Sequence, residues 1–379
     1  MAFDCLVAGG TVFDPAAGLN ARLDVGIRAG RVVAVGPSLP REGTPAVVDA
    51  EGCYVTPGLI DLHSHVYWGV SEYGVDADQV ILPAGVTTTV DAGSSGAANF
   101  PGFRRYVIEP SRIRILAFVH LAVHGIQPPP ATELRDIAYA DADRAAETVR
   151  ANPDVAVGIK IRMSDDTVGD HGQHAFAEAL RAAELAGKPL MVHIGRTALP
   201  LENIFDALRP GDVVTHCYTP QAPCVIGDSG RVRDCVRRAR ERGVLLDVGH
   251  GRGSCHFDLV RTAFDQDLKP DTISTDLHAF SRATPVVDLL TTLSKFLALG
   301  MTLEEVILAA TAAPARALGR ADTLGRIEIG READLAILEL RAKPATLVDA
   351  RGTRLDVRQL LRARHTIRAG VLVPPLSSD

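Results

Sequence analysis

The segment Ile60-Asp-Leu-His-Ser-His65 decides how the rest of the sequence is interpreted. Alternate residues of a strand face the same side, so Asp61, His63 and His65 share one face. From Pro57 onward the sequence pattern changes, and short apolar runs alternate with longer helical stretches. A strand that opens such a region and ends in histidines predicts a polar site at the carboxyl ends of parallel strands.

Eight runs in the middle of the chain have the length and composition of buried strands. They are Gly58–His63, Thr87–Asp91, Ile113–His120, Val155–Arg162, Pro189–His193, Val213–His216, Val244–Val248 and Thr272–Asp276. Helical patterns such as Ala175–Leu185 and Phe257–Phe264 lie between several of them. Eight strands alternating with helices over about 250 residues predict a (β/α)8 TIM barrel, an α/β fold. An open doubly wound sheet is the alternative, but there a Gly-rich phosphate turn usually follows the first strand.

The two ends of the chain differ from its middle. Short β-rich runs punctuated by turns fill residues 1–56, and short strands return after a helix expected at Leu303–Leu318. We expect the two ends to meet in one small β-sandwich domain, formed by residues 1–56 and 319–379. The barrel domain would then span residues 57–318.

Composition and charge exclude several kinds of protein. The chain has 379 residues, a net charge of −6 and no strongly basic region, so nucleic acid is not an expected partner. No stretch of about 18 apolar residues lacks charge, so no membrane span is expected. Met1–Gly10 lacks the pattern of a signal peptide, and the six cysteines show no Cys-x-x-Cys spacing. We therefore expect a cytoplasmic protein with reduced thiols.

Ionisable residues end several of the predicted strands. His193 ends the fifth run, His216 the sixth and Asp276 the eighth, and barrel active sites are built at that end. A single buried histidine is usually an ordinary core residue. A whole set without a shared ligand, however, would leave several groups unsatisfied, each costing roughly 1–3 kcal/mol. A divalent metal resolves this, because neutral imidazoles and a carboxylate suit zinc, manganese, iron, cobalt or nickel.

Lys160 is also expected to point toward this polar site. The β-branched residues of Val155–Arg162 share one face, so Lys160 and Arg162 point into the barrel. An ammonium group there is desolvated, which should lower its pKa. A neutral amine can add carbon dioxide to form a carbamate, an anion able to bridge two metals. The alternative is an ion pair with Asp61 or Asp276.

These residues resemble the metal-ligand set of the amidohydrolase superfamily. The matching positions are His63 and His65 after Pro57–Asp61, then Lys160, His193, His216 and Asp276. Thr311–Ala315, Gly325–Gly330 and Ala333–Ala336 resemble the family's last helix and returning strands, so the resemblance covers nearly the whole chain.

The resemblance implies a binuclear site with two divalent metal ions, zinc being the first choice. One ion would be bound by His63, His65 and Asp276, and the other by His193 and His216. Carbamylated Lys160 and a hydroxide would bridge the two ions. Asp276 would take the proton from the hydroxide and deliver it to the leaving group.

Within the superfamily the chain resembles the dihydroorotase-related branch. True dihydroorotases carry a carboxylate-binding arginine two residues after the second histidine, where this chain has Tyr67, followed by Trp68. Gly158–Arg162 and His216–Thr219 look more like a deacetylase-type subgroup, which hydrolyses N-acyl amino acids or acylated 2-hydroxy acids. A cyclic amide hydrolase of the dihydroorotase or hydantoinase type is the main alternative. A non-catalytic scaffold is a third hypothesis, but it should have lost metal ligands.

A substrate that bears a carboxylate needs a cation in the site. Arg162 is the first choice, because it lies on the Lys160 face, one pleat further out. Arg252 and Arg282, on predicted loops, are further candidates, and for each arginine the alternative is a salt bridge at the barrel rim. His250 is expected either to contact the leaving group or to be structural. The expected partner is a small molecule, and soluble enzymes of this kind often form symmetric homo-oligomers.

Overall fold

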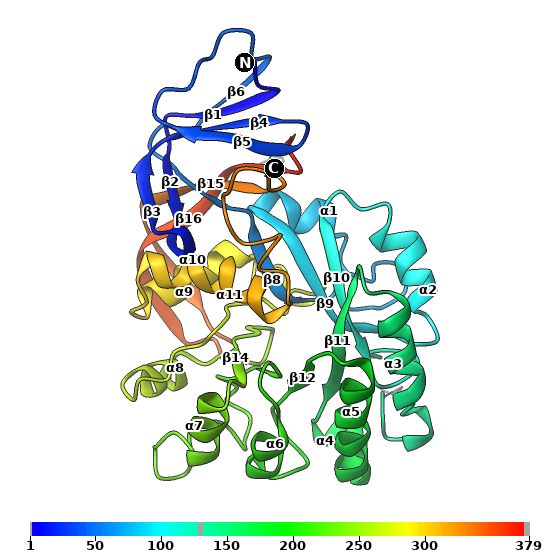
Figure 1. The fold of residues 1–379 in the computed structure, drawn as a ribbon. Coiled ribbons are helices and arrows are strands. Elements are labelled where there is room, and N and C mark those ends of the chain that lie inside the picture. Colours follow the sequence, from blue (N-terminus) through cyan, green and yellow to red (C-terminus); the bar gives the residue numbers. More distant parts are fainter. Residues whose placement is uncertain (1, 128–131, 375–379) are drawn as a thin grey trace.

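The computed structural model describes residues 2–127 and 132–374, and at its centre is a curled parallel sheet (Figure 1). The sheet has seven strands in the order β14-β13-β12-β11-β10-β9-β8, and every neighbouring pair is parallel. Its strands are β8 (Leu59–Ser64), β9 (Val86–Gly96), β10 (Arg114–His120), β11 (Ala156–Arg162), β12 (Leu190–His193), β13 (Val213–Thr215) and β14 (Leu245–Asp247). Seven of the eight predicted strands are therefore found in sequence order, which confirms an α/β fold.

The eighth predicted strand is an extended segment instead of a regular strand. It makes isolated parallel bridges to both edges of the sheet, Asp247 with Thr272 and Ser64 with Leu277. The Asp276 N–H also donates to the His63 carbonyl at 2.6 Å. Asp276 has a positive φ of 49°, a conformation that no strand can continue through. The sharp turn shortens the strand and brings its last residue to the edge beside β8.

Helices alternate with these strands and cover the outside of the sheet (Figure 1). They are α1 (Ala77–Val80), α2 (Phe100–Phe103), α3 (Ala142–Ala151), α4 (Asp165–Val168), α5 (Gly172–Ala186), α6 (Leu201–Ala207), α7 (Asp234–Glu241), α8 (Phe257–Phe264), α9 (Leu289–Ala298), α10 (Leu303–Ala309) and α11 (Ala312–Ala317). The single helix predicted at 303–318 is thus two helices, broken at Ala310 and Thr311. None of the helices in the described residues is long and apolar enough to cross a bilayer.

The two ends of the chain form two further sheets. One has the order β5-β4-β1-β6, with β1 (Cys5–Ala8), β4 (Asp24–Arg28), β5 (Arg31–Gly36) and β6 (Ala46–Asp49). The other has the order β17-β16-β15-β7-β2-β3, with β2 (Thr11–Asp14), β3 (Leu19–Arg22), β7 (Tyr54–Pro57), β15 (Leu335–Val348), β16 (Arg354–Arg368) and β17 (Val371–Val373).

The N- and C-terminal segments meet in the second of these sheets. Strand β7 pairs antiparallel with β15, with Pro57 opposite Leu335, and Figure 1 shows the blue and orange-red strands side by side. One apolar cluster contains Val7 and Ile27 of the first sheet and Val55 and Ile337 of the second. The two sheets therefore share a core, separate from the clusters around the parallel sheet.

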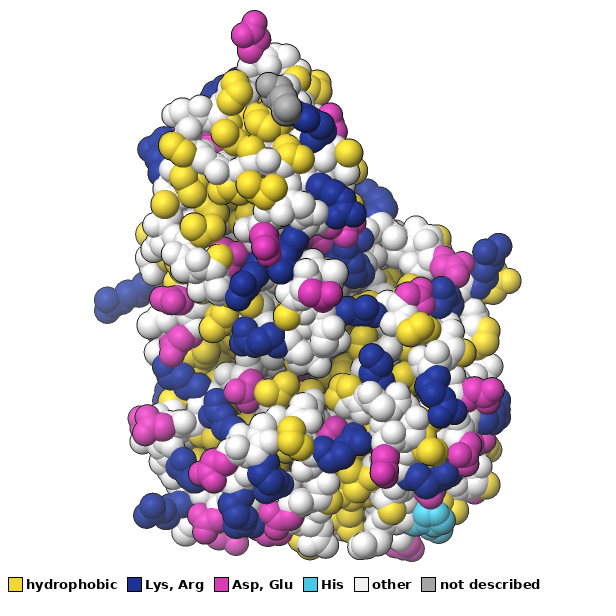
Figure 2. Space-filling model, viewed as in Figure 1, with side chains coloured by type: hydrophobic (Ala, Val, Ile, Leu, Met, Phe, Trp, Pro, Cys, Tyr) yellow, Lys and Arg dark blue, Asp and Glu magenta, His cyan; other side chains and the backbone are white. Residues whose placement is uncertain are grey.

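Strands β15 and β16 form a hairpin that extends beyond the end sheets. Strand β16 of this hairpin packs against α9, and the Leu361 N–H donates to Ser294 Oγ at 2.9 Å. On the face drawn in Figure 2, basic and acidic side chains are interspersed over the helical part of the molecule.

Candidate metal centre and active-site cavity

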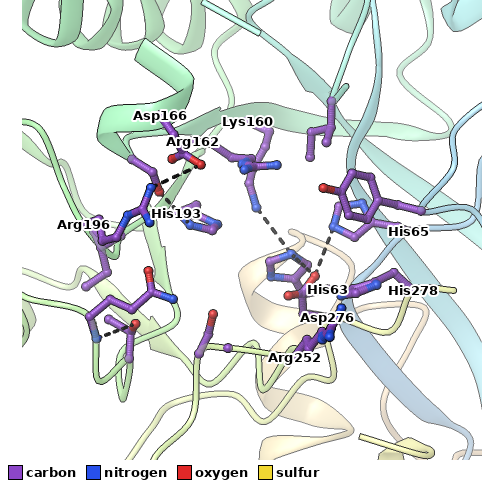
Figure 3. Close-up of a pocket in the computed structure, with 18 residues that line it drawn as sticks. His63, His65, Lys160, Arg162, Asp166, His193, Arg196, Arg252, Asp276 and His278 are labelled. Carbon is purple, nitrogen blue, oxygen red and sulfur yellow. Dashed lines mark hydrogen bonds and ion pairs between the residues drawn. The ribbon is translucent and has the colours of Figure 1, made fainter. Parts of the chain in front are cut away.

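A cavity of about 260 Å³ opens at the carboxyl ends of the parallel strands (Figure 3). Its lining is more polar than apolar and includes most of the ionisable residues predicted from the sequence: His63, His65, Lys160, Arg162, His193, Arg252 and Asp276. The strand ends bring these residues together because all seven strands run in the same direction. His216 lies behind this lining, with its ring centroid 4.2 Å from that of His193 and 5.0 Å from that of His63.

A chain of hydrogen bonds fixes the tautomer of His63. Thr215 Oγ1 donates to Asp247 Oδ2 at 2.8 Å and therefore accepts a proton from His63 Nδ1, also at 2.8 Å. The Asp247 carboxylate accepts two further hydroxyl bonds, from Thr272 at 2.7 Å and Ser274 at 2.7 Å. With its proton on Nδ1, His63 presents the Nε2 lone pair to the cavity, which is the form that binds a metal.

His216 is held in the same way. Its Nδ1 donates to the Gly249 carbonyl at 2.6 Å, so the ring proton is on Nδ1 and the lone pair on Nε2. That buried Nε2 has no hydrogen-bond partner among the described residues. A φ of 66° at His216 turns the chain sharply after β13 and points the ring inward. Such backbone conformations are costly and cluster at functional sites.

Asp276 brings a carboxylate to these lone pairs. Its Oδ1 lies 3.3 Å from Nε2 of His63 and 3.1 Å from Nε2 of His65. For the His63 tautomer described above, this contact joins two acceptor atoms with no proton between them. His63, His216 and Asp276 each offer one ligand atom within 4.8 Å of the others. A bound cation satisfies this arrangement, so the donor set fits a divalent metal.

Burial keeps the imidazoles in their neutral, metal-binding form. It lowers the pKa of His216 to about 4 and holds the pKa values of His63 and His193 well below the usual range. Nearby Lys160 also lowers the pKa of His63, and nearby His216 that of His193. At neutral pH none of these three rings needs to lose a proton before it binds a cation.

Lys160 is completely buried among these groups. Its Nζ lies 3.5 Å from His63 Nε2 and 3.6 Å from Met191 Sδ. No described carboxylate forms an ion pair with it, so the alternative pairing with Asp61 or Asp276 is not found. The Asp61 carboxylate instead accepts bonds from Thr275, at 2.5 Å from Oγ1 and 3.0 Å from the backbone N–H. Burial lowers the pKa of Lys160 to about 7, which makes the amine nucleophilic near neutral pH.

The arginines around the cavity differ in how they are paired. Arg162 lies 3.2 Å from the carboxylate of Glu133, which is completely buried. Arg196 lies 3.2 Å from Asp165 on the rim. Arg252 has no ion pair or hydrogen bond with any described residue, although it lines the cavity. Of these three arginines, Arg252 is therefore the one without an ion pair in the described residues, whereas the sequence favoured Arg162.

Two predicted substrate-binding residues do not line the cavity. His250 is completely buried, and both of its ring nitrogens have protein partners. Nδ1 donates to the Gly251 carbonyl at 3.0 Å, and Nε2 accepts from Lys295 Nζ at 2.9 Å. Arg282 is exposed on the loop before α9, outside the cavity lining.

Sequence reasoning assigned no role to several cavity residues, which lie outside the regular strands and helices. They include Tyr73, Ser164, Thr219, Gln221, Ser254 and His278. Ser164 contacts His193 Nε2 at 3.2 Å, and the Tyr73 ring packs edge-on against His278 at 5.4 Å. Tyr67 is outside the cavity lining: its hydroxyl donates to the Asn99 carbonyl at 3.2 Å and its ring packs on Phe103.

Histidines and an aspartate that converge at the carboxyl ends of a curled parallel sheet are typical of metal-dependent hydrolases. The model of the amidohydrolase family matches residues 54–370. A deacetylase of Agrobacterium fabrum is 36% identical over 339 residues, which are 89% of this chain and 83% of that protein.

Two solved structures are similar over nearly the whole chain. One is described as an adenine deaminase, with 30% identity and a TM-score of 0.91, and the match covers 98% of this chain and 99% of that chain. The other is described as a dihydroorotase, with 33% identity, the same TM-score of 0.91 and the same coverage of 98% and 99%. The chain belongs to the amidohydrolase family and is a hydrolase that acts on C–N bonds.

Proposed function

We propose that the protein is a binuclear metal-dependent hydrolase that cleaves an amide or ester bond of a small acylated carboxylate. N-acyl amino acids and acylated 2-hydroxy acids are the expected substrates. The relative named deacetylase supports an acyl group as the part released. A cavity of about 260 Å³ is near the lower end of ligand-pocket volumes, which supports a small substrate.

The proposed metal ligands are the six residues at the strand ends: His63, His65 and Asp276 for one ion, His193 and His216 for the second, and carbamylated Lys160 for both. The ligand atoms of His63, His216 and Asp276, which lie close together, support the core of this set. Zinc is the first choice, because it readily accepts imidazole and carboxylate ligands. Two bound divalent ions would lower the pKa of a coordinated water and polarise the scissile carbonyl.

Asp276 is the proposed proton carrier. It receives a proton from the attacking water and returns it to the leaving nitrogen or oxygen. Two features support a fixed position for its carboxylate. The preceding residue, Thr275, is tied to Asp61, and a Cβ built at Gly251 would lie only 2.3 Å from Asp276 Oδ2. Only a glycine backbone allows the neighbouring loop to approach the carboxylate so closely.

The single observation that carries the choice of substrate is the unpaired Arg252. Figure 3 shows its side chain beside Asp276 and His278, at the edge of the proposed metal centre. Burial is the main cause of the lowered pKa of His278, and the Arg252 charge acts in the same direction. A guanidinium so close to the reacting groups suits a carboxylate near the scissile bond, as in α-acylamino and α-acyloxy acids.

The test is a hydrolysis screen of the metal-loaded protein with N-acyl D- and L-amino acids, acylated 2-hydroxy acids, dihydroorotate and hydantoins. Release of the acyl group from carboxylate substrates, with little activity on the matching carboxamides, is the expected result. Ring opening without any cleavage of acylated carboxylates would refute the proposal.

A cyclic amide hydrolase is the second candidate, favoured by the similarity to a structure described as a dihydroorotase. Against it, the tyrosine that replaces the arginine of true dihydroorotases, Tyr67, is buried away from the cavity and bonds to Asn99. The segment after His65 thus offers no cation to a ring substrate.

We also propose the larger architecture that goes with this function. Segment 272–277 would close the seven strands into a (β/α)8 barrel, because it is bridged to both edge strands. The two end sheets would form a β-sandwich domain from residues 1–56 and 319–379, of which 375–379 lie outside the described residues. The six free thiols agree with a cytoplasmic setting.

A further inference from the structure

The hairpin of β15 and β16 reaches from the end sheets to the loops that line the cavity. Its turn, residues 349–353, lies against the start of α8. Below the turn, Leu355, Val357 and Leu360 bury Phe257, the first residue of α8, in a small apolar cluster of their own. The turn is therefore held in place by packing as well as by polar contacts.

Asp349 accepts hydrogen bonds both from this turn and from the start of α8 beside it. Its side chain is completely buried, and His256 Nε2 lies 3.8 Å from Oδ2. Its hydrogen bonds in the described residues all come from backbone N–H groups. Oδ1 accepts from Arg351 at 2.8 Å and Thr353 at 2.9 Å within the turn, and Oδ2 accepts from Phe257 at 3.0 Å. A carboxylate at this helix start also interacts favourably with the helix dipole.

The turn makes two further bonds, each to a loop of the cavity. The Ala350 N–H donates to the Cys255 carbonyl at 3.0 Å, directly after Ser254 in the loop that carries Arg252. Arg351 Nη2 donates to the Pro220 carbonyl at 3.1 Å. Pro220 lies between Thr219 and Gln221, and both of these side chains line the cavity.

The two loops that the turn contacts, around Pro220 and Cys255, also contact each other. The His256 N–H donates to the Tyr218 carbonyl at 3.1 Å, and a Cβ at Gly253 would lie 3.2 Å from Gln221 Nε2. The loop from 248 to 256 contains three glycines, Gly249, Gly251 and Gly253, next to Ser254. Glycine has no side chain that could pack and hold Arg252 in place. External contacts from the turn supply that constraint.

We infer that Asp349 and Arg351 are positioning residues for substrate binding, acting through the loops that carry Arg252, Ser254, Thr219 and Gln221. The expected effect on KM rests on the proposed function, whereas the expected effect on loop order does not. The metal centre stands on the strand ends and their hydrogen bonds, so loosening the loops should weaken substrate binding and leave the metal in place.

The first experiment needs no substrate. Hydrogen exchange is compared in wild type, Arg351→Ala, Asp349→Asn and the control Arg354→Ala. The Arg354 side chain is exposed and has no hydrogen bond or ion pair with the described residues. Peptides covering 217–222 and 249–257 should exchange at least about tenfold faster in Arg351→Ala and Asp349→Asn than in the control. Equal exchange in folded Arg351→Ala and the control would overturn the inference.

The second experiment uses the substrate identified by the hydrolysis screen. For Arg351→Ala, KM should rise about tenfold while kcat stays within about twofold, with metal content equal to that of wild type. An unchanged KM, or a fall in kcat together with metal loss, would overturn the inference. If wild type hydrolyses no acylated carboxylate, the proposed function fails, and the exchange experiment still decides the positioning role.

Discussion

The protein buries two lysines, and the difference between their surroundings separates a structural site from a reactive one. Lys295 on α9 donates to the Pro285 carbonyl at 2.6 Å and to His250 Nε2 at 2.9 Å. Lys160 on β11 has only a longer contact to His63 at 3.5 Å and a sulfur contact to Met191 at 3.6 Å. Burial lowers the pKa of both, to about 8 for Lys295 and about 7 for Lys160.

Burial and a lowered pKa therefore do not identify a functional lysine by themselves. At Lys295 the protein supplies short bonds to good acceptors, so the side chain is satisfied without any ligand. At Lys160 the neighbours are a histidine lone pair, a thioether and the converging ligands of the candidate metal centre. A group that the protein leaves poorly satisfied in its core is the one expected to react or to bind something else.

The largest expected effect is the loss of Lys160. In Lys160→Met, activity should fall by at least about a thousandfold, and metal content should drop, because the carbamate proposed to bridge the two ions could not form. Lys295→Met should keep its metal and activity within about tenfold of wild type. Elemental analysis and kinetics of both variants check this pair, and equal metal loss in both would break the comparison.

The next effect is the loss of the proposed proton carrier. Asp276→Asn should reduce kcat by about 10²- to 10⁴-fold, because the amide cannot accept the proton of the attacking water. Circular dichroism and elemental analysis would establish that the variant is folded and report its metal. A folded Asp276→Asn protein with full activity would rule out the proton-carrier role.

The same contrast between paired and unpaired groups applies to the arginines. Arg252→Met should reduce kcat/KM by about 10- to 100-fold for acylated carboxylates and by much less for the matching carboxamides. Arg196→Met is the matched control, because Arg196 lines the same cavity but is paired with Asp165. Equal losses in the two variants would show that pairing does not distinguish these cations.

Labelling with carbon dioxide tests directly which of the two buried lysines forms a carbamate. After exchange with 13C-labelled bicarbonate, wild type should show a carbamate resonance that is absent from Lys160→Met and retained in Lys295→Met. The reason is that, of the lysines in the described residues, only Lys160 combines a pKa of about 7 with a nearby candidate metal centre. A resonance that persists in Lys160→Met would show that it does not come from a carbamate on Lys160.

The smallest effect concerns stability. The pKa of Lys295 is lowered to about 8 from its ordinary 10.5, so the unfolded chain binds more protons between these values. Stability should therefore rise with pH from about 8 toward 10.5. Lys295→Met lacks this contribution, so wild type should gain relative to it over that range in urea unfolding. A difference that is independent of pH would contradict the lowered pKa.

Strand periodicity predicted the α/β fold and located several of the ionisable residues that line the cavity. Alternation in Val155–Arg162 assigned Lys160 to the inner face, and the runs before His193 and His216 located those residues at strand ends. Such patterns record which residues are buried together, and parallel strands bring their ends to one place.

Pairing between distant residues could not be predicted in the same way. The sequence predicts Arg162 as the carboxylate anchor, but in the structure Arg162 is paired with Glu133, which lies on a loop well before β11. For His250 the sequence leaves both a substrate contact and a structural role open, and only the structure shows that Lys295 of α9 occupies its Nε2. These partners come from other elements, and no local periodicity connects them.

The metal content of the purified protein tests the central claim most directly. Protein from metal-replete cells, analysed by plasma mass spectrometry, should contain about two divalent ions per chain, and Lys160→Met should contain fewer. A folded wild-type protein that contains no divalent metal, and binds none when zinc, manganese, iron, cobalt or nickel is supplied, would contradict the account.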